Sequence, residues 1–376
     1  MRNLRRTVLA SVLGLLAFSV ARLSAAPLPS EIKVGAVETL TGDNSAYGVS
    51  IRKGLELALS EINAGKLLGA AKIRLIFMDD KADKQEGISV FSRLIDDEKV
   101  SAIIGPTLSS TAFAADPVAQ KAGVPVLATS NTATGITAMG NFIFRDSLLQ
   151  SGVIPGSLAA VAARFHPRKA ALLYEATNEY SKSEAEVFKA ALQKLGIQLV
   201  ATESYSRGDA DFRTQLSKLN ARRPDIFVVS SLVGEAIPVL QQAREIGIVQ
   251  PIVGGNGFNS PNVLRNAKAA AEGLIVGSAW FIDSTAPKSR AFVAAFRKMY
   301  SADPDQFAAQ AYDGLYILAT AIRNAGSADR AAIRDARAAI RNLDGVLGTF
   351  SFDENRDPVH PSVTLVVREG RFTLFP

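Results

Sequence analysis

The chain of 376 residues contains no cysteine, only two histidines and a single tryptophan. Without cysteine it can form neither a disulfide framework nor a thiolate metal site, and it has no thiol to carry a lipid anchor. His166 and His360 each precede a proline, and neither stands at a metal-ligand spacing or beside a nucleophile motif. Disulfide-stabilised and thiolate-metal proteins are therefore excluded.

Sequence signatures of enzymes are also absent. There is no G-x-S-x-G nucleophile elbow and no H-E-x-x-H zinc motif, and Gly255-Asn256-Gly257 lacks the third glycine of a dinucleotide-binding fingerprint. We predict a protein that is not an enzyme, with no catalytic residue, no metal site and no cofactor. An acid/base pair assembled from distant aspartates and glutamates remains open as an alternative.

After the N-terminus the sequence has no long apolar run. The first 26 residues have the pattern of an export signal. Arg2, Arg5 and Arg6 form a basic end, residues 7–21 an apolar core, and residues 24–26 a small-residue cleavage region. We therefore predict a signal peptide at residues 1–26 and a soluble periplasmic mature protein. The ordinary export route is favoured, although Arg5-Arg6 loosely resembles a twin-arginine signal.

Excess charge is small in the predicted mature chain. The full sequence has 42 basic and 36 acidic residues, a net charge of +6. Four arginines and no acid lie in residues 1–26, so their removal lowers the net charge from +6 to +2. Nucleic-acid binding needs clustered lysine and arginine, so we expect no nucleic acid as a partner.

What the sequence does contain is a regular alternation of strand-like and helix-like segments. The remaining 350 residues are enough for two domains at about 150 residues each. Strands are predicted at 32–37, 73–78, 100–104, 124–128, 142–145, 170–174, 198–203, 226–230, 252–253, 274–276 and 363–367. Helices are predicted from about 51 and at 85–95, 109–122, 148–165, 183–195, 212–219, 235–246, 288–300, 305–324 and 329–342. This alternation predicts an α/β protein with two doubly wound, mainly parallel sheets.

Polar residues follow three strands of the first predicted sheet. Tyr47 lies in the loop after the first strand, Ser109–Thr111 follow the third, and Ser130–Thr132 follow the fourth. Because the carboxyl ends of parallel strands meet at one edge, we expect these groups to cluster beside a ligand crevice. A helix beginning at Ser109 or Ser110 would offer free N–H groups to a carboxylate, whereas an ordinary capped helix start is the alternative.

Several short motifs, taken in order, make the chain resemble the leucine/isoleucine/valine-binding protein family. These proteins are the type I periplasmic substrate-binding components of ABC transporters. The motifs are Ile32-Lys33-Val34-Gly35, Leu40-Thr41-Gly42, Tyr47-Gly48, Asp79-Asp80, Ile103-Ile104-Gly105-Pro106, Ser109-Ser110, Val124-Pro125, Phe144-Arg145 and Ala311-Tyr312-Asp313-Gly314-Leu315. The likeness spans essentially the whole mature chain.

The resemblance implies two lobes of type I periplasmic binding fold, joined by a three-crossover hinge and closing around a small ligand that is passed to a membrane permease. The first lobe would comprise residues 27–149 and 280–350, and the second residues 150–279 and 351–376. Crossings would lie near 146–150, 278–281 and 350–354. In the first lobe, Ser109, Thr132 and the backbone of Ser130 would hold a ligand carboxylate, with Tyr47 lining the pocket.

In the second lobe, Tyr180 and Asn256 match pocket positions of the family, and two departures there leave the ligand open. Relatives that bind amino acids usually carry an acid where this chain has Asn256, and often an aromatic residue where it has Leu232. A branched-chain or related amino acid is the leading interpretation, and amides or aliphatic or aromatic acids are alternatives. Glu38, Glu235 and Asp283 are candidates for the missing charge, and an ordinary exposed acid of a loop or helix is the alternative for each. A ligand-sensing protein of the same fold is the functional alternative.

Overall fold

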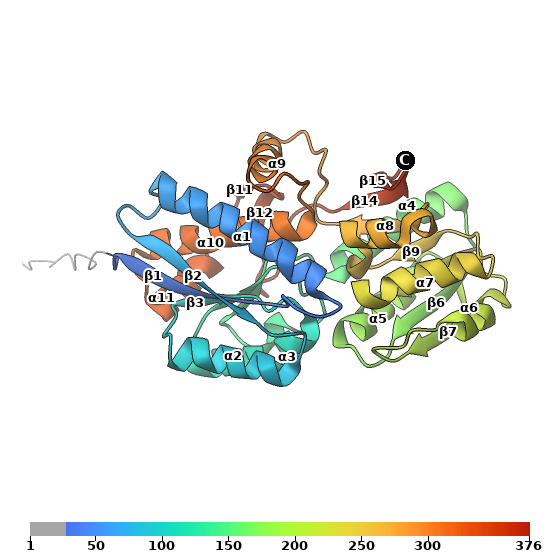
Figure 1. Cartoon of the computed structure of the whole chain (residues 1–376), viewed down its shortest axis with the longest axis horizontal. Helices are drawn as coiled ribbons and strands as arrows, with labels where there is room; N and C mark the ends of the chain where they lie inside the picture. Colours follow the sequence, from blue (N-terminus) through green and yellow to red (C-terminus); the bar gives the residue numbers. More distant parts are fainter. Residues whose placement is uncertain (1–27) are drawn as a thin grey trace, which may run out of the picture.

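The protein is built as two lobes placed end to end, each around its own sheet (Figure 1). The computed structural model describes residues 28–376, so the signal peptide predicted at residues 1–26 lies outside the described residues. Among the described helices, none combines the length and the apolar character needed to cross a membrane.

The first lobe contains five parallel strands in the order β2-β1-β3-β4-β5. These strands are β1 (Glu31–Glu38), β2 (Lys72–Asp79), β3 (Ala102–Ile104), β4 (Val126–Ala128) and β5 (Ile143–Arg145). The helices are α1 (Ser45–Gly65), α2 (Lys84–Asp96), α3 (Ser109–Ala122), η1 (Thr137–Met139), α9 (Pro287–Tyr300), α10 (Gln306–Ala325) and α11 (Arg330–Ala338). Side chains alternate along β1, so that Val34 and Ala36 pack with α1 and α10 while Val37 packs with α2 and α3.

The second lobe contains seven strands in the order β15-β14-β10-β9-β8-β6-β7, of which β6 to β10 are parallel. These strands are β6 (Lys169–Glu175), β7 (Gln198–Tyr205), β8 (Ile226–Ser230), β9 (Ile252–Gly254), β10 (Ile275–Ser278), β14 (Val363–Arg368) and β15 (Arg371–Leu374). The helices are α4 (Gln150–Phe165), α5 (Glu179–Lys194), α6 (Arg213–Asn220), α7 (Val233–Glu245), η2 (Asn256–Phe258), α8 (Pro261–Ala267) and η3 (Lys268–Ala271). Apolar residues of α4 and α5 pack on one face of the sheet, and those of α6, α7 and α8 on the other.

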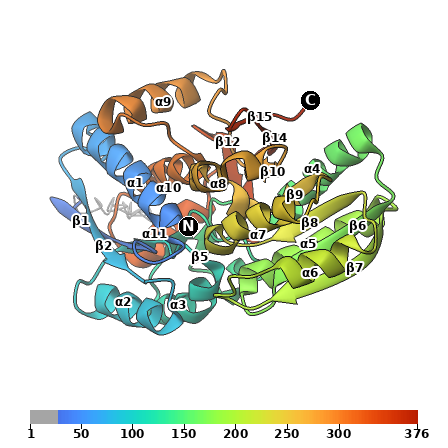
Figure 2. The ribbon, with the colours of Figure 1, turned by 45° about the vertical axis from the view of Figure 1, so that its right-hand side comes forward.

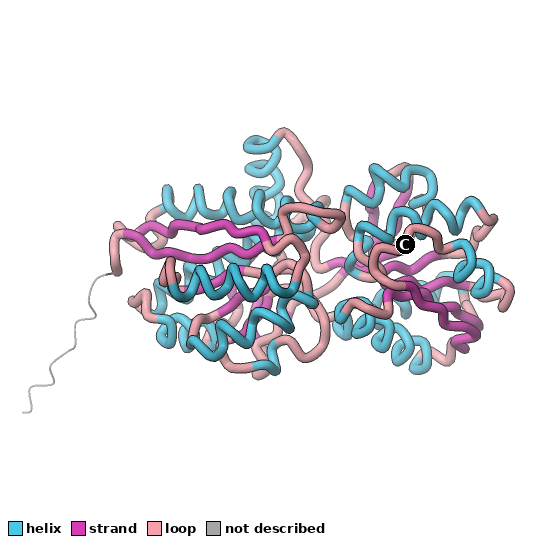
Figure 3. The backbone as a smooth tube through the Cα atoms, turned by 60° about the horizontal axis from the view of Figure 1, so that its bottom comes forward, coloured by secondary structure: helices cyan, strands magenta, loops and turns pink. Residues whose placement is uncertain are grey.

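Figures 2 and 3 show the same layering in both lobes, with helices on each side of a twisted sheet. The predicted α/β fold of two doubly wound parallel-sheet lobes is confirmed. The sequence patterns missed α8, although Ser260 caps its N-terminus and Pro261 occupies its first position, which are ordinary signals of a helix start.

The chain passes between the two lobes three times. The first passage, at 146–149, and the second, at 279–286, overlap the ranges expected from the sequence. The third lies at 360–362, later than the expected 350–354. The lobe boundary at residue 350 was therefore wrong, because β12 (Gly348–Phe352) crosses it and pairs with both β11 (Leu343–Gly345) and β13 (Pro358–Val359).

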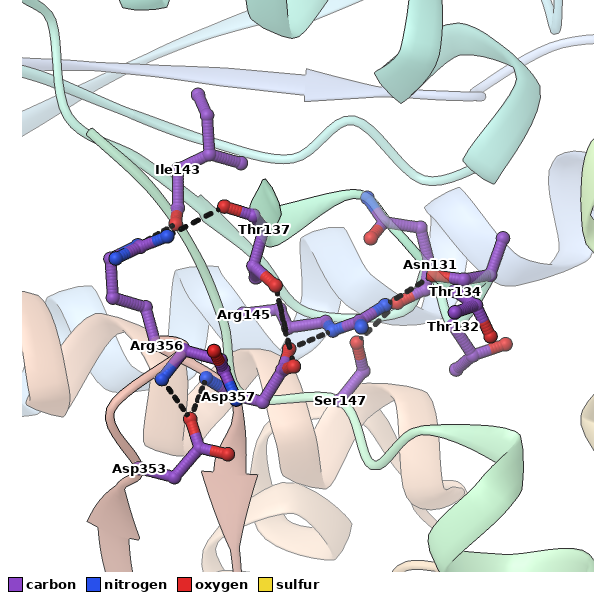
Figure 4. Close-up of polar contacts among 12 residues, drawn as sticks. Asn131, Thr132, Thr134, Thr137, Ile143, Arg145, Ser147, Asp353, Arg356 and Asp357 are labelled. Carbon is purple, nitrogen blue, oxygen red and sulfur yellow. Dashed lines mark hydrogen bonds and ion pairs between the residues drawn. The ribbon is translucent and has the colours of Figure 1, made fainter. Parts of the chain in front are cut away.

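A buried ion pair holds the β12–β13 region on the first lobe (Figure 4). Arg145 Nε, at the end of β5, lies 2.5 Å from Asp357 Oδ1, and the Arg145 side chain is fully buried. The Thr137 hydroxyl donates to the same carboxylate at 3.2 Å. Arg356 donates to the carbonyl of Thr137 at 2.8 Å. Residues 351–359 thus belong structurally with the first sheet.

Candidate functional site

A pocket lies between the two lobes, where the carboxyl ends of both parallel sheets meet. It encloses about 320 Å³, counting the space open to solvent. Its lining comes from both lobes and consists of Tyr47, Thr107, Leu108, Ser109, Ser130, Asn131, Asn178, Tyr180, Leu232, Asn256, Gly257 and Phe307. Every lining side chain is uncharged, and hydroxyl and amide groups alternate with apolar walls.

Five of the six residues expected at the site line this pocket: Tyr47, Ser109, Ser130, Tyr180 and Asn256. Tyr47 lies in the first turn of α1 rather than in the loop before it, because the helix already begins at Ser45. Thr132 is the exception. Its hydroxyl oxygen accepts from Gln150 Nε2 at 2.9 Å, so its side chain is engaged beside the pocket and does not line it.

The first-lobe wall presents an uncapped helix start. α3 begins at Ser109, and the preceding Leu108 provides no side-chain cap, so the ordinary capped start considered from the sequence is not what the structure shows. Ser109 Oγ accepts from the backbone N–H groups of Thr132 and Ala133, both at 3.2 Å. These two bonds use the oxygen and leave the hydroxyl hydrogen to be donated. The arrangement can donate hydrogen bonds to an anion.

The neighbouring loop is fixed by buried hydrogen bonds. Ser130 Oγ donates to the carbonyl of Thr107 at 2.7 Å, and Asn131 Nδ2 donates to that of Pro106 at 3.0 Å. From below the loop, Ser147 donates to the Asn131 carbonyl at 2.6 Å (Figure 4). The Ser130 hydroxyl and the Asn131 amide are therefore held by backbone carbonyls of the neighbouring loop.

The second-lobe wall contains a buried acid that the sequence reasoning missed. Glu184 lies one turn after Tyr180 on α5, and the Tyr180 hydroxyl donates to its carboxylate at 2.8 Å. The Asn256 backbone N–H donates to Glu184 Oε1 at 3.1 Å. The spacing of four residues, which places two side chains on one helix face, was the signal available in the sequence.

Glu184 is tightly packed and fully buried. Burial raises the pKa of its carboxyl to about 7. A Cβ atom on Gly255 would lie 1.8–2.0 Å from that carboxyl group, so a side chain there would have to displace it.

The three acids considered from the sequence do not line the pocket. Glu38 lies behind Thr107, whose hydroxyl donates to it at 2.6 Å, and burial raises its pKa well above the usual range. Glu235 accepts from the Gly208 N–H at 3.4 Å, and Asp283 is exposed. None of the three therefore supplies a charge at the pocket surface.

Several contacts join the lobes across the pocket mouth, so the structure describes a closed arrangement. The Tyr47 hydroxyl donates to the carbonyl of Gly257 at 2.6 Å, and the two residues come from opposite lobes. Lys84 and Glu179 form an ion pair at 2.7 Å between the two lobes. Within residues 28–376, no group of histidine, aspartate and glutamate side chains could hold a metal ion.

Two doubly wound lobes closing over an uncharged pocket define a class: the two-lobed binding proteins that enclose a small ligand. The family model described as periplasmic binding protein matches residues 31–371. The chain belongs to this family, as its sequence motifs suggested, and it is a binding protein rather than an enzyme.

Individual relatives agree with this assignment. The leucine-, isoleucine-, valine-, threonine- and alanine-binding protein of Pseudomonas aeruginosa is 26% identical over 87% of each chain. The branched-chain amino acid transporter substrate-binding protein LivJ of Streptococcus pneumoniae, solved with isoleucine, is 32% identical, with a TM-score of 0.85 over 91% of this chain and 97% of that one. A Rhodopseudomonas palustris solute-binding protein solved with benzoate has a TM-score of 0.84 at 23% identity, over 92% and 95% of the two chains, and shows the shared fold.

Proposed function

We propose that the protein captures a small, apolar, carboxylate-bearing solute in the periplasm and delivers it to the membrane permease of an ABC importer. A branched-chain or related amino acid is the favoured ligand. The predicted export signal at residues 1–26 supports the location, and the family supports the transport role. In this proposal Ser109, the backbone N–H of Ser130 and the start of α3 hold the carboxylate, while Tyr47, Tyr180 and Asn256 complete the enclosure.

The observation that carries the proposal is the uncapped start of α3 in a pocket with apolar walls. Leu108, Leu232 and Phe307 supply those walls, and Phe307 packs against the ring of Tyr47 with centroids 4.8 Å apart. Helix N–H groups and the Ser109 hydroxyl favour an anion, and the walls favour an aliphatic or aromatic body. The alternative ligands, an amide or a plain acid, share part of this chemistry.

A ligand panel tests the proposal. Thermal melting of the mature protein is measured against branched-chain amino acids, their amides, aliphatic acids and aromatic acids. A ligand at 100 times its dissociation constant should add about 2.7 kcal/mol to the free energy of unfolding. A transport receptor returns its ligand chemically unchanged. The absence of any shift across the panel would contradict the proposed ligand class.

Substitution of Ser109 then tests the carboxylate site. Ser109→Ala should weaken binding by about 1 to 3 kcal/mol, because a hydrogen bond to a charged group is lost. Ser92→Ala is the matched control, since Ser92 also lies on a helix of the first lobe but donates only to its own helix, to the Ile88 carbonyl at 3.0 Å. Equal affinity of both variants and the wild type would remove the proposed carboxylate site.

A further inference from the structure

The acid buried behind the second-lobe wall bears directly on which ligand the pocket selects. Glu184 is fully buried, and its carboxylate accepts from the Tyr180 hydroxyl and from the backbone N–H of Asn256. Tyr180 and Asn256 both line the pocket. The carboxylate therefore lies directly behind two residues that line the pocket.

No cation in the described part of the chain balances this acid. The groups that hydrogen-bond to Glu184 are the neutral Tyr180 hydroxyl, Asn256 N–H and Ser230 hydroxyl, and no lysine, arginine or histidine lines the pocket. An uncompensated charge in a dry site acts over a longer range than one in water, because little solvent screens it. A positive group entering the pocket is the partner that this site lacks.

The side chains around Glu184 hold it in place. The Tyr180 hydroxyl accepts from the Gly257 N–H at 2.8 Å while donating to Glu184, and Gly257 in turn accepts from Tyr47 across the cleft. The carboxylate fills the space that a side chain at Gly255 would occupy. The acid is thus built into the wall formed by α5 and the turn after β9.

We propose that Glu184 selects a zwitterionic α-amino acid over the corresponding plain acid, acting on the ligand ammonium group through Tyr180 and Asn256 as a positioning and charge-supplying residue. This inference rests on the proposed function, since it assumes that the ligand carboxylate is held at Ser109. It assigns to Glu184 the negative charge that Asn256 does not carry.

The proposal predicts that amino-acid binding depends on pH through Glu184 alone, because the other titratable side chains beside it do not ionise near neutral pH. Two titratable side chains face Glu184, Tyr180 from its own helix and Tyr47 from α1 across the cleft. Burial raises the pKa of both phenols well above the usual value, so neither ionises near neutral pH. The carboxyl of Glu184, with its pKa raised to about 7 by burial, is the group that changes charge there. Amino-acid affinity should therefore rise as pH increases through neutrality.

The experiment compares isoleucine with 3-methylpentanoate, the same molecule without its ammonium group, by isothermal titration calorimetry on the mature protein. The wild type should bind isoleucine more tightly. Glu184→Gln should lose about tenfold or more in isoleucine affinity, with 3-methylpentanoate affinity unchanged or increased, because the charge is removed while the size of the side chain is kept. Glu186→Gln, which removes an exposed acid from the same helix, is the control and should match the wild type.

A second measurement needs no variant. Calorimetry in buffers of different ionisation enthalpy counts the protons exchanged on binding. At about pH 7 isoleucine should release protons from the wild type, because the ammonium lowers the pKa of Glu184, whereas 3-methylpentanoate should drive proton uptake. The exchange should vanish in Glu184→Gln.

The outcomes separate this proposal from the proposed function. Equal losses for both ligands in Glu184→Gln would assign the residue a purely structural role, and absence of proton exchange in the wild type would likewise overturn the inference. Tighter wild-type binding of 3-methylpentanoate would overturn it while leaving an acid-binding receptor intact. If neither these ligands nor any other of the panel binds the wild type, the proposed ligand class fails, and the inference fails with it.

Discussion

The contact between Tyr47 and Gly257 provides a direct test of lobe closure. Tyr47→Phe removes the hydroxyl that donates to the Gly257 carbonyl at 2.6 Å but keeps the ring that packs on Phe307. In an open arrangement that carbonyl can bind water, so the loss falls on the closed state alone. A buried hydrogen bond lost with its acceptor left unpaired costs about 1 to 2 kcal/mol, which is a factor of about 5 to 30 in the equilibrium between closed and open forms.

The assay is ligand affinity by calorimetry, combined with small-angle X-ray scattering of the ligand-free and ligand-saturated protein. Affinity should fall by up to that factor, because the apparent affinity scales with the closed fraction of the ligand-free protein, and any loss of that fraction should make the ligand-free ensemble more extended. Tyr300→Phe is the matched control: its hydroxyl donates to the Lys53 carbonyl at 2.9 Å, and both residues belong to the first lobe. Unchanged affinity in Tyr47→Phe, or an equal loss in Tyr300→Phe, would refute the reasoning.

Three further predictions concern the surroundings of the site. Thr132→Ala should weaken ligand binding less than Ser109→Ala does, because the Thr132 hydroxyl is bonded away from the pocket; calorimetry with the panel's ligand measures both. Asp357→Asn should lower the free energy of unfolding by about 3 to 5 kcal/mol in urea denaturation, because it leaves the buried Arg145 without its counter-charge. The thermal midpoint of the ligand-free protein should fall as pH rises from about 5 to 8, and it should fall less in Glu184→Gln. The pKa of Glu184 in the folded protein is about 7, above the usual glutamate value, so the stability that protonated Glu184 contributes is lost as pH rises through 7.

The periodic parts of the fold were predictable because each element carries its own local pattern. The helix at 109–122 was expected at the bounds it has, since Gly123 ends it in a left-handed conformation that glycine adopts readily. The small sheet of β11, β12 and β13 was not predicted from the sequence. Their short strands depend on pairing partners rather than on a repeating pattern, so the third passage between lobes was placed too early.

In the candidate site, too, some residues could be predicted from the sequence and others could not. Residues that follow strands, such as Ser109 and Ser130, could be assigned to one sheet edge from topology alone, and the structure places them in one pocket. Thr132 shares their sequence context, yet its side chain turns toward Gln150. The direction of a side chain in a loop depends on its neighbours in space, and the order of residues along the chain does not reveal those neighbours.

By itself, the sequence determined that the chain forms two doubly wound α/β lobes and that the polar residues after several strands meet at a sheet edge, because period, capping and strand direction are local properties. Only the tertiary structure decided that Glu184 lies behind the pocket and that Tyr47 bridges the lobes to Gly257. Both facts depend on residues 72 and 210 positions apart in the chain, and the burial that shifts the pKa of Glu184 exists only once the helix α5 and the turn after β9 are packed together.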